Sequence, residues 1–376
     1  MFLLGVPTSF AQAVHKLALW TLLAIIFSSI VRFMLLLDIN KRVYNHAPGP
    51  CRAFREIVNG SAGLEQIDEE NLVFITTGLA KYRGIENTKS GLFIYSFPEP
   101  SDQAVQHIAR EVKIENFSLS HFAPFGVTHF SSKGRLHLYI INRFPTPNCV
   151  ESFTYNKEKN TATYRKSICD PRFSSLQDIV AVGPDRFFVT NTQFSGRLWA
   201  QTVEAAFQAS SGSLYLWDGK SVIPSINWMP TPGGLALDKK RSLLFVGSIL
   251  SETIRVYQLT PSLALKQQTE ISLLSSPMGI YVEETSGDIW TALLPIVHTT
   301  FYHLTDPAES RIRAPSQVLR VRLQEDGISW IVTEPYANDG ATLSASASVL
   351  FAKDQLLIGS LFGRLLHCDV INPMIT

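Results

Sequence analysis

A short strand, a polar turn and a second strand recur along most of this 376-residue chain. In residues 176–191 an apolar run, Ile179–Val182, meets a Gly-Pro-Asp turn, and a second run, Arg186–Thr190, leaves it. Runs of this length, rich in β-branched and aromatic residues, predict a hairpin rather than a helix. The pattern returns at residues 71–79, 91–97, 126–142, 234–258, 279–293 and 346–368.

Six such units, each followed by one or two further strands, repeat at a period of roughly 50 residues. This period with about four strands per unit is typical of a β-propeller blade. A set of β-sandwiches would explain the strands but not the regular return of one hairpin. We therefore expect an all-β fold, a six-bladed β-propeller.

Residues 17–37, LALWTLLAIIFSSIVRFMLLL, form one long apolar segment. At about 1.5 Å per residue, a helix of this length spans a hydrocarbon core of roughly 30 Å. A cleaved signal peptide is the alternative, but its apolar stretch is shorter and no small-residue cleavage site precedes Asp38. We therefore expect a single-pass transmembrane signal anchor at 17–37, with a cytosolic tail at 1–16, a tether at 38–50 and the propeller at 51–376.

Two lines of sequence evidence disagree about the side of the membrane that holds the body. Lys16 before the segment and Lys41 and Arg42 after it favour a cytosolic body when the flanking charges are the only guide. The four cysteines and the N-x-S sequons at Asn59 and Asn116 favour an oxidising, glycosylating compartment. We expect a glycoprotein with a lumenal or extracellular body, in the endoplasmic reticulum or at the plasma membrane.

The cysteines are placed as two pairs. Cys149 and Cys169 flank a candidate hairpin, and a turn centred on Lys159 sets the two residues opposite each other, as a disulfide requires. Cys51 and Cys368 lie at the two ends of the body, so a bond between them would close the chain into a ring.

The composition and the motifs exclude several classes of function. A net charge of +1 with 17% charged residues gives no basic field, so we expect no nucleic-acid partner. The nine histidines show no zinc-ligand spacing, and the sequence has no G-x-S-x-G elbow or phosphate loop. A group of acids near the first blade could offer a cation site, although acids at a strand edge are usually only solvated: Glu56, Glu65, Asp68, Glu69 and Glu70.

One stretch, residues 198–209, interrupts the β pattern. Trp199, Val203 and Phe207 recur there every four residues and lie on one face of a predicted helix. Such an apolar face more often packs on its own domain. The other interpretation makes these three residues a surface for a partner or the membrane.

Residues 51–368 resemble the paraoxonase/arylesterase family of six-bladed propellers. The resemblance is carried jointly by LQDIVAVGPDRFF, FSLSHFAPFGVTHF, SGDIWTA, EPYANDGATL and LLIGSLFGRLLHC. The family's retained apolar segment and its ring-closing disulfide correspond to residues 17–37 and to Cys51 with Cys368. Its amphipathic helix over the mouth of the site corresponds to the stretch around Trp199.

Members of that family are lactonases and arylesterases in which a tunnel calcium polarises the ester carbonyl and a histidine pair assists water attack. The resemblance places the catalytic calcium ligands on Ala62, Gln177, Gly233, Met278 and Gly279. A structural calcium retains Asp178 but loses an acid to Gly63, and the histidine pair falls on Phe125 and Arg143. Calcium takes six to eight oxygen ligands, and only Gln177 of the catalytic set offers a side-chain oxygen. The resemblance therefore implies no catalytic residue, no metal site and no cofactor.

Within the family, the stretch DINKRVYNHAPGPC at residues 38–51 is most similar to nematode membrane-anchored paraoxonase-like proteins. Those proteins assist the folding, surface delivery and activity of degenerin-type sodium channels, including the touch-receptor channel. The resemblance implies a pseudoenzyme that serves as a chaperone or accessory subunit of a membrane partner, probably in mechanosensation. The alternative is a calcium-dependent lactonase or arylesterase with rearranged ligands.

Overall fold

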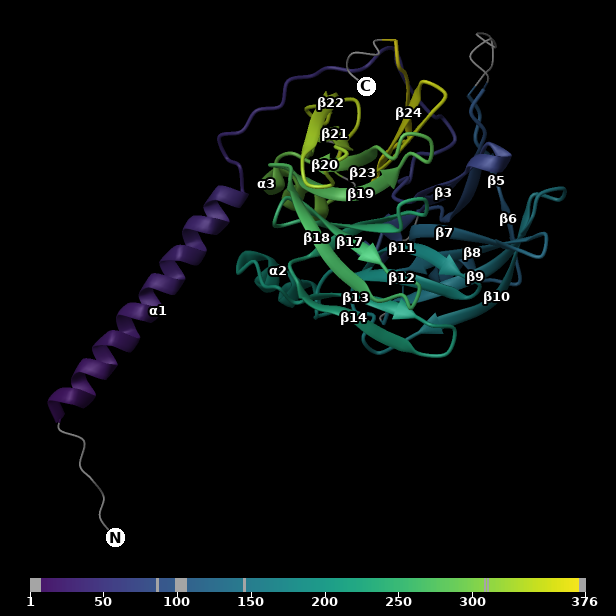
Figure 1. The fold of residues 1–376 in the computed structure, drawn as a ribbon. Coiled ribbons are helices and arrows are strands. Elements are labelled where there is room, and N and C mark those ends of the chain that lie inside the picture. Colours follow the sequence, from purple (N-terminus) through teal and green to yellow (C-terminus); the bar gives the residue numbers. More distant parts are fainter. Residues whose placement is uncertain are drawn as a thin grey trace.

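The computed structural model describes residues 8–85, 88–98, 107–144, 147–307, 309 and 311–371. Its body is a six-bladed β-propeller, which confirms the predicted fold class (Figure 1). Each blade is one sheet, and the strands of the six blades, each from the inner strand outward, are β2 (Leu64–Ile67), β3 (Leu72–Thr77), β4 (Gly91–Tyr95) and β5 (Arg110–Glu111); β7 (Pro124–Ser132), β8 (Arg135–Asn142), β9 (Cys149–Asn156), β10 (Thr161–Cys169) and β6 (Lys113–Glu115); β11 (Leu176–Gly183), β12 (Arg186–Asn191), β13 (Gly212–Trp217) and β14 (Val222–Met229); β15 (Pro232–Asp238), β16 (Leu243–Ser248), β17 (Thr253–Leu259) and β18 (Leu265–Ser272); β19 (Ser276–Val282), β20 (Ile289–Leu294), β21 (Ser316–Leu323) and β22 (Trp330–Asn338); and β23 (Ser346–Ala352), β24 (Gln355–Ser360), β25 (Leu366–Asp369) and β1 (Cys51–Ala53).

The second strand of a blade is buried along almost its whole length. β16 (LLFVGS) and β24 (QLLIGS) have no exposed residue, because neighbouring blades cover both faces of these sheets. This explains why these strands read as continuous apolar runs rather than as an alternation of apolar and polar residues.

Hydroxyl groups on second strands join each of two blades to the inner strand of the next blade. Thr76 on β3 donates to the Phe125 carbonyl at 2.8 Å, and Thr190 on β12 donates to the Gly233 carbonyl at 2.8 Å. Both acceptors lie where inner strands approach the propeller axis. These bonds therefore fix the backbone around the central tunnel.

The sixth blade closes the ring with strands from both ends of the body. β1 pairs with β25, Cys51 stands opposite Cys368, and the two form a disulfide. Cys149 on β9 and Cys169 on β10 form the second disulfide, inside the second blade.

Helix α1 (Thr8–Leu36) stands apart from the propeller (Figure 1). Residues Ser9–Leu35 are long and apolar enough to cross a membrane, and none of the most apolar window is buried in the structure. The helix begins at Thr8 rather than at Leu17, because the preceding residues, TSFAQAVHK, are compatible with helix and continue it beyond the apolar segment.

The segment between α1 and β1, expected to be a tether, lies against the propeller. His46 exchanges two backbone hydrogen bonds with Ala337 on β22, at 2.9 and 3.1 Å. Lys41 donates to the Leu274 carbonyl at 2.6 Å. The segment therefore holds the end of α1 at a defined place on the body.

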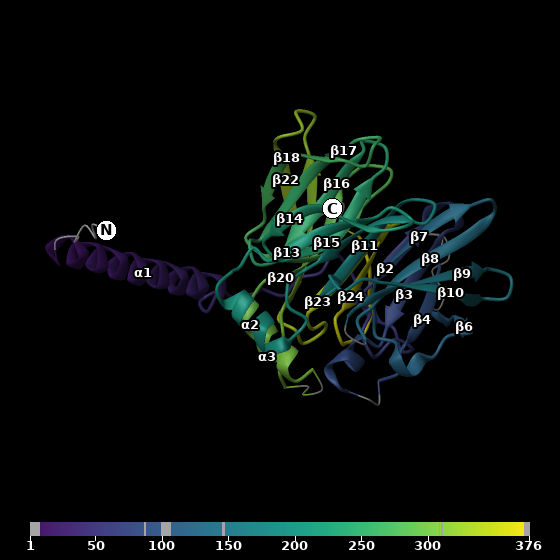
Figure 2. The same cartoon turned by 90° about the horizontal axis from the view of Figure 1, so that it is seen from below.

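Two helices interrupt the β pattern, where the sequence analysis expected one. α2 (Leu198–Ala206) is the expected helix, and α3 (Val297–Thr305) was missed. They lie beside each other, next to the end of α1 that meets the body (Figure 2). Short 3-10 helices occur at η1 (Asp68–Glu70), η2 (Leu79–Arg83) and η3 (Leu119–His121).

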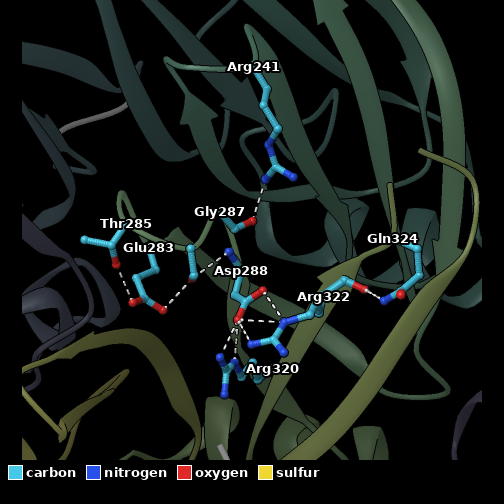
Figure 3. Close-up of polar contacts among 9 residues, drawn as sticks. Arg241, Glu283, Thr285, Gly287, Asp288, Arg320, Arg322 and Gln324 are labelled. Atoms are coloured by element: carbon cyan, nitrogen blue, oxygen red, sulfur yellow. Dashed lines mark hydrogen bonds and ion pairs between the residues drawn. The ribbon is translucent and has the colours of Figure 1, made fainter. Parts of the chain in front are cut away.

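A buried ion cluster stabilises the fifth blade. Asp288, only 2% exposed, bonds with Arg320 and with Arg322, the latter at 2.8 Å (Figure 3). Burial opposes ionisation of Asp288, but the hydrogen bonds from Arg322 and Arg320 outweigh it and lower the pKa of this carboxyl. The cluster ties the start of β20 to β21 and accounts for the acid in the SGDIWTA stretch.

Candidate functional site

Two cavities meet inside the central tunnel. The larger, of about 330 Å³, is lined by the inner strands; we call it the far-side cavity. The smaller, of about 160 Å³, lies under α2 and α3; we call it the helix-side cavity. Phe125, Gln177 and Met278 line both cavities and so lie between them. The structure thus brings together at the tunnel centre three of the positions that the sequence analysis singled out.

Gln177 is fully engaged with its neighbours. Its amide nitrogen donates to the Met278 carbonyl at 3.2 Å, and its amide oxygen accepts from the Thr192 hydroxyl at 3.1 Å. The side chain is 5% exposed. Its one oxygen already has a partner, so this residue serves to bridge β11 and β19 across the tunnel.

The glycines of the expected ligand set are required by close backbone approach. A Cβ at Gly279 would overlap the Ala347 carbonyl oxygen of β23, and one at Gly63 would overlap the Phe125 carbonyl oxygen. At Gly233 a Cβ would lie 3.0 Å from the Gln177 amide nitrogen. A ligating side chain at Gly279 or Gly63 would therefore demand a shift of the neighbouring inner strand.

Arg143 occupies the helix-side cavity next to Phe125. Its guanidinium carbon lies 4.7 Å from the Tyr82 ring centroid and 5.5 Å from that of Phe125, and it donates to the Ser175 hydroxyl at 3.0 Å. Burial lowers the pKa of Arg143. The group nonetheless stays cationic at neutral pH, as arginine does in proteins.

The helix-side cavity has a positive lining. Arg83 and Arg143 both face it, and no aspartate or glutamate is among its lining residues. Within the part of the chain that the structure describes, no carboxylate pairs with either guanidinium. Fixed positive charge raises the free energy of a divalent cation placed nearby.

The far-side cavity holds Asp178 and Glu65. The Asp178 carboxyl accepts backbone N–H bonds from Leu235 at 2.8 Å and Ile179 at 2.9 Å. Burial, with a smaller contribution from the Glu65 charge, outweighs these bonds and raises the pKa of Asp178 to about 7. One Glu65 oxygen accepts from the ring and the backbone N–H of His129, at 2.7 and 3.1 Å.

These two acids fall short of a calcium site. Calcium takes six to eight oxygens, several of them charged, whereas the groups here already accept hydrogen bonds from protein donors. The other acids noted near the first blade disperse: Glu69 lines the far-side cavity, Glu70 pairs with Lys157, and Glu56 is exposed. Among the described residues, the only grouping of three possible metal ligands lies elsewhere on the molecule.

The apolar stripe of α2 faces outward. Trp199 is 66% exposed, Val203 48% and Phe207 64%, so the interpretation that this face packs on its own domain is wrong. Phe194, just before α2, and Tyr302 on α3 are 81% and 64% exposed. We call these five residues the helical rim.

The helical rim lies close to the end of the candidate membrane helix. Gln208, just after α2, donates to the Arg32 carbonyl at 3.2 Å, and the His298 ring on α3 bonds the Leu37 carbonyl. The chain that leaves α1 therefore touches the loop or helix on which the rim stands (Figure 2).

The two sequons differ in accessibility. Asn116 is exposed in the turn after β6. Asn59 is half-buried, and its amide makes a long hydrogen bond of 3.5 Å to the Lys89 carbonyl. Asn116 is the more open acceptor for a glycan.

Sequence reasoning missed Arg83, Tyr82 and α3 as parts of this site. Val297, Phe301 and Leu304 carry the apolar i, i+4, i+7 spacing of a helix face, and that signal was available. All three line the helix-side cavity.

Comparison with known proteins identifies similar chains and folds. The arylesterase family model matches residues 36–370. The chain is 40% identical over 379 residues to mechanosensory abnormality protein 6 of Caenorhabditis elegans, covering 99% of this chain and 100% of that protein. It is 26% identical over 319 residues to human serum paraoxonase/arylesterase 2, covering 82% and 86% of the two chains. Among solved structures, a luciferin-regenerating enzyme superposes with a TM-score of 0.52 at 13% identity, over 86% of this chain and 96% of that one, which supports the fold alone.

Proposed function

Because this chain belongs to the arylesterase family, we propose that it is a non-catalytic, membrane-anchored member that binds a membrane protein and assists its folding, surface delivery or activity. The observation that carries the proposal is the content of the tunnel. Phe125 and Arg143 stand where the resemblance places the catalytic histidines, and Gln177 is bonded to protein groups.

Metal-assisted ester hydrolysis needs a cation to stabilise the developing oxyanion and a base to activate water. Ala62, Met278 and Gly279 supply no side-chain oxygen for the cation, and Arg143 adds a positive charge beside its place. Phe125 supplies no base. Both requirements fail at several positions, so one compensating residue would not restore the reaction.

The anchor determines where such a protein works. We place residues 17–37 across the membrane, residues 1–16 in the cytosol and the propeller in the lumen or outside the cell, with glycans at Asn59 and Asn116. The contacts from Gln208 and His298 to the end of α1 support a helical rim at the bilayer surface. Exposed tryptophan, tyrosine and phenylalanine side chains suit that interface, or an apolar partner beside it.

The partner we propose is a degenerin-type sodium channel. The similar nematode protein is named for a mechanosensory defect, and the resemblance at residues 38–51 implies a channel accessory role. Confinement to one membrane raises the effective concentration of a neighbour, so modest contacts suffice to hold a complex. The same confinement allows the protein to act as a chaperone in the endoplasmic reticulum or as a subunit at the cell surface.

The test is copurification of a co-expressed degenerin-type channel with the full-length chain from membranes. Replacement of Trp199 and Phe207 by serine should reduce recovery of the channel several-fold, and so should release of the body from residues 17–37. Trp228→Ser, which changes an equally exposed tryptophan on β14, serves as the matched control and should leave recovery unchanged.

A second control addresses the tunnel. Met278→Asn returns an oxygen to one ligand position and should not alter channel recovery, provided the variant reaches the membrane in normal amounts. Equal recovery with the rim variants and with wild type would contradict the proposed surface, and no recovery with any form would contradict the proposed partner.

A further inference from the structure

Three metal-ligating side chains outside the tunnel gather where the last blade meets the first. His107 lies just before β5 of the first blade, and His367 and Asp369 stand two apart on β25 of the sixth. Side chains two apart on a strand point to the same face of the sheet. One ligand atom from each of the three residues lies within 4.8 Å of the others.

The hydrogen bonds around His367 leave one ring nitrogen free. The Gln355 amide nitrogen donates to the Pro98 carbonyl at 3.2 Å, so the Gln355 amide oxygen is the acceptor that faces His367 Nε2 at 2.9 Å. Nε2 therefore carries the proton and Nδ1 carries the lone pair. A ring nitrogen bonded to an outer acceptor in this way is the usual arrangement of a metal-binding histidine.

His107 has a comparable outer partner. Its Nδ1 lies 2.8 Å from the Tyr95 hydroxyl, and its ring stacks on that of His367 with centroids 3.9 Å apart. When Nδ1–H donates to the Tyr95 oxygen, Nε2 is the free ligand. His367 is 1% exposed, so this pair of rings is held in place by the surrounding protein.

We propose that His107, His367 and Asp369 form a binding site for a first-row divalent transition metal, with zinc as the reference ion. Two imidazoles and one carboxylate suit such metals, whereas calcium and magnesium prefer oxygen ligands. Ligands around a tetrahedral zinc ion lie roughly 3.4 Å apart, given bonds of about 2.0–2.2 Å. Small side-chain rotations bring the three groups to that separation, and the remaining position is open to water.

The site bridges the seam of the propeller. His367 and Asp369 flank Cys368, which forms the ring-closing disulfide, while His107 belongs to the neighbouring blade. A metal bound to all three residues would be a second clasp between the two ends of the body. Since the ligands come together only in the folded ring, binding stabilises the native state by mass action.

Arg52 tunes the affinity. It pairs with His367 across β1 and β25, and its positive charge opposes a bound cation. Its side chain is exposed, so the effect is screened. Arg52→Gln should therefore tighten metal binding by a few-fold.

The experiment uses the full-length protein, purified in detergent without a polyhistidine tag and stripped with a chelator. Titration with zinc is followed by calorimetry and by the melting temperature, and titration with cobalt by visible absorption. We expect one zinc per chain, a melting temperature raised by several degrees, and cobalt bands of low coordination number. His107→Ala and Asp369→Asn, both at half-buried positions, should weaken binding at least tenfold and abolish the shift.

His121→Ala is the matched control, because it removes an exposed histidine on η3 that contacts Ser120 and Phe144. It should bind zinc like wild type. The proposal is overturned if wild type and His107→Ala bind zinc equally, or if His121→Ala removes the same binding. Neither result depends on the partner or on the state of the tunnel.

Discussion

The guanidinium carbon of Arg143 lies 4.7 Å from the centroid of the Tyr82 ring, inside the helix-side cavity. The ring face, the Phe125 ring and the Ser175 hydroxyl hold this cation without a described carboxylate partner. Arg143→Gln should lower the free energy of unfolding by about 1–2 kcal/mol, the sum expected for a partly desolvated cation–π contact and one hydrogen bond. Arg135→Gln, at an exposed position on β8, should change it by less than about 0.5 kcal/mol. Denaturant titration of both variants provides the comparison, and equal effects would contradict the structural role.

Asp178 gives the tunnel a diagnostic pH dependence. Burial raises the pKa of Asp178 to about 7, above the value of about 4 in the unfolded chain. The folded state therefore binds the proton more tightly, and this contribution to stability is full below about pH 4 and lost as pH rises through about 7. Because the cavity admits solvent, we expect roughly 1–2 kcal/mol across that range.

Asp178→Asn should remove this slope, measured as the difference between wild-type and variant melting curves from pH 4 to pH 8. Glu65 and His129 face the same cavity and titrate in both forms, so the difference isolates Asp178. A carboxylate that bound calcium would produce the opposite sign, with the wild type gaining stability over the variant as pH rises.

Asp288 tests the value of a buried ion cluster. Asp288→Asn leaves Arg320 and Arg322 without their common partner and should cost about 3 kcal/mol in chemical denaturation. Asp185→Asn breaks the exposed pair with Lys166 and should cost less than about 1 kcal/mol. Similar losses in the two variants would refute the special weight given to the buried cluster.

The two disulfides close loops of very different length. Cys51–Cys368 spans 317 residues and Cys149–Cys169 spans 20. In the chain-entropy model these are worth about 5 and about 3 kcal/mol, so the Cys51→Ser, Cys368→Ser double variant should be the less stable one. Equilibrium unfolding of each double variant measures this, and the reverse order would argue against a ring closed mainly by the first bond.

The hairpins could be predicted from the sequence because strand length and turn chemistry are local properties. The runs Ile179–Val182 and Arg186–Thr190 became β11 and β12 around the expected turn, in which Asp185 has φ of 54°. Asp tolerates this left-handed conformation better than most residues.

The Cys149–Cys169 pairing was predicted correctly on incomplete grounds. Next to the turn Asn156 faces Thr161, a register that would set Cys149 opposite Ile168. A bulge between Tyr164 and Lys166 shifts the register by one residue and brings the cysteines together. Bulges depend on neighbouring packing, so a pattern of alternating residues does not reveal them.

Long-range features were beyond local patterns. The contact of His46 with Ala337 turns the expected tether into an ordered part of the body, and the cluster of His107 with His367 exists only because the ring closes. The resemblance located Gln177 in the tunnel, but the satisfaction of its amide by Thr192 and Met278 required the structure.

The most direct test of the central claim is hydrolysis by the purified full-length protein. Turnover of phenyl acetate and of an aliphatic lactone is measured with millimolar calcium and with a calcium chelator, beside a catalytically active paraoxonase as positive control. We predict no turnover above the buffer rate in either condition, because no base and no calcium ligand set stand at Phe125, Arg143 and Met278. Calcium-dependent turnover that disappears on Asp178→Asn would contradict the account and establish a rearranged active site.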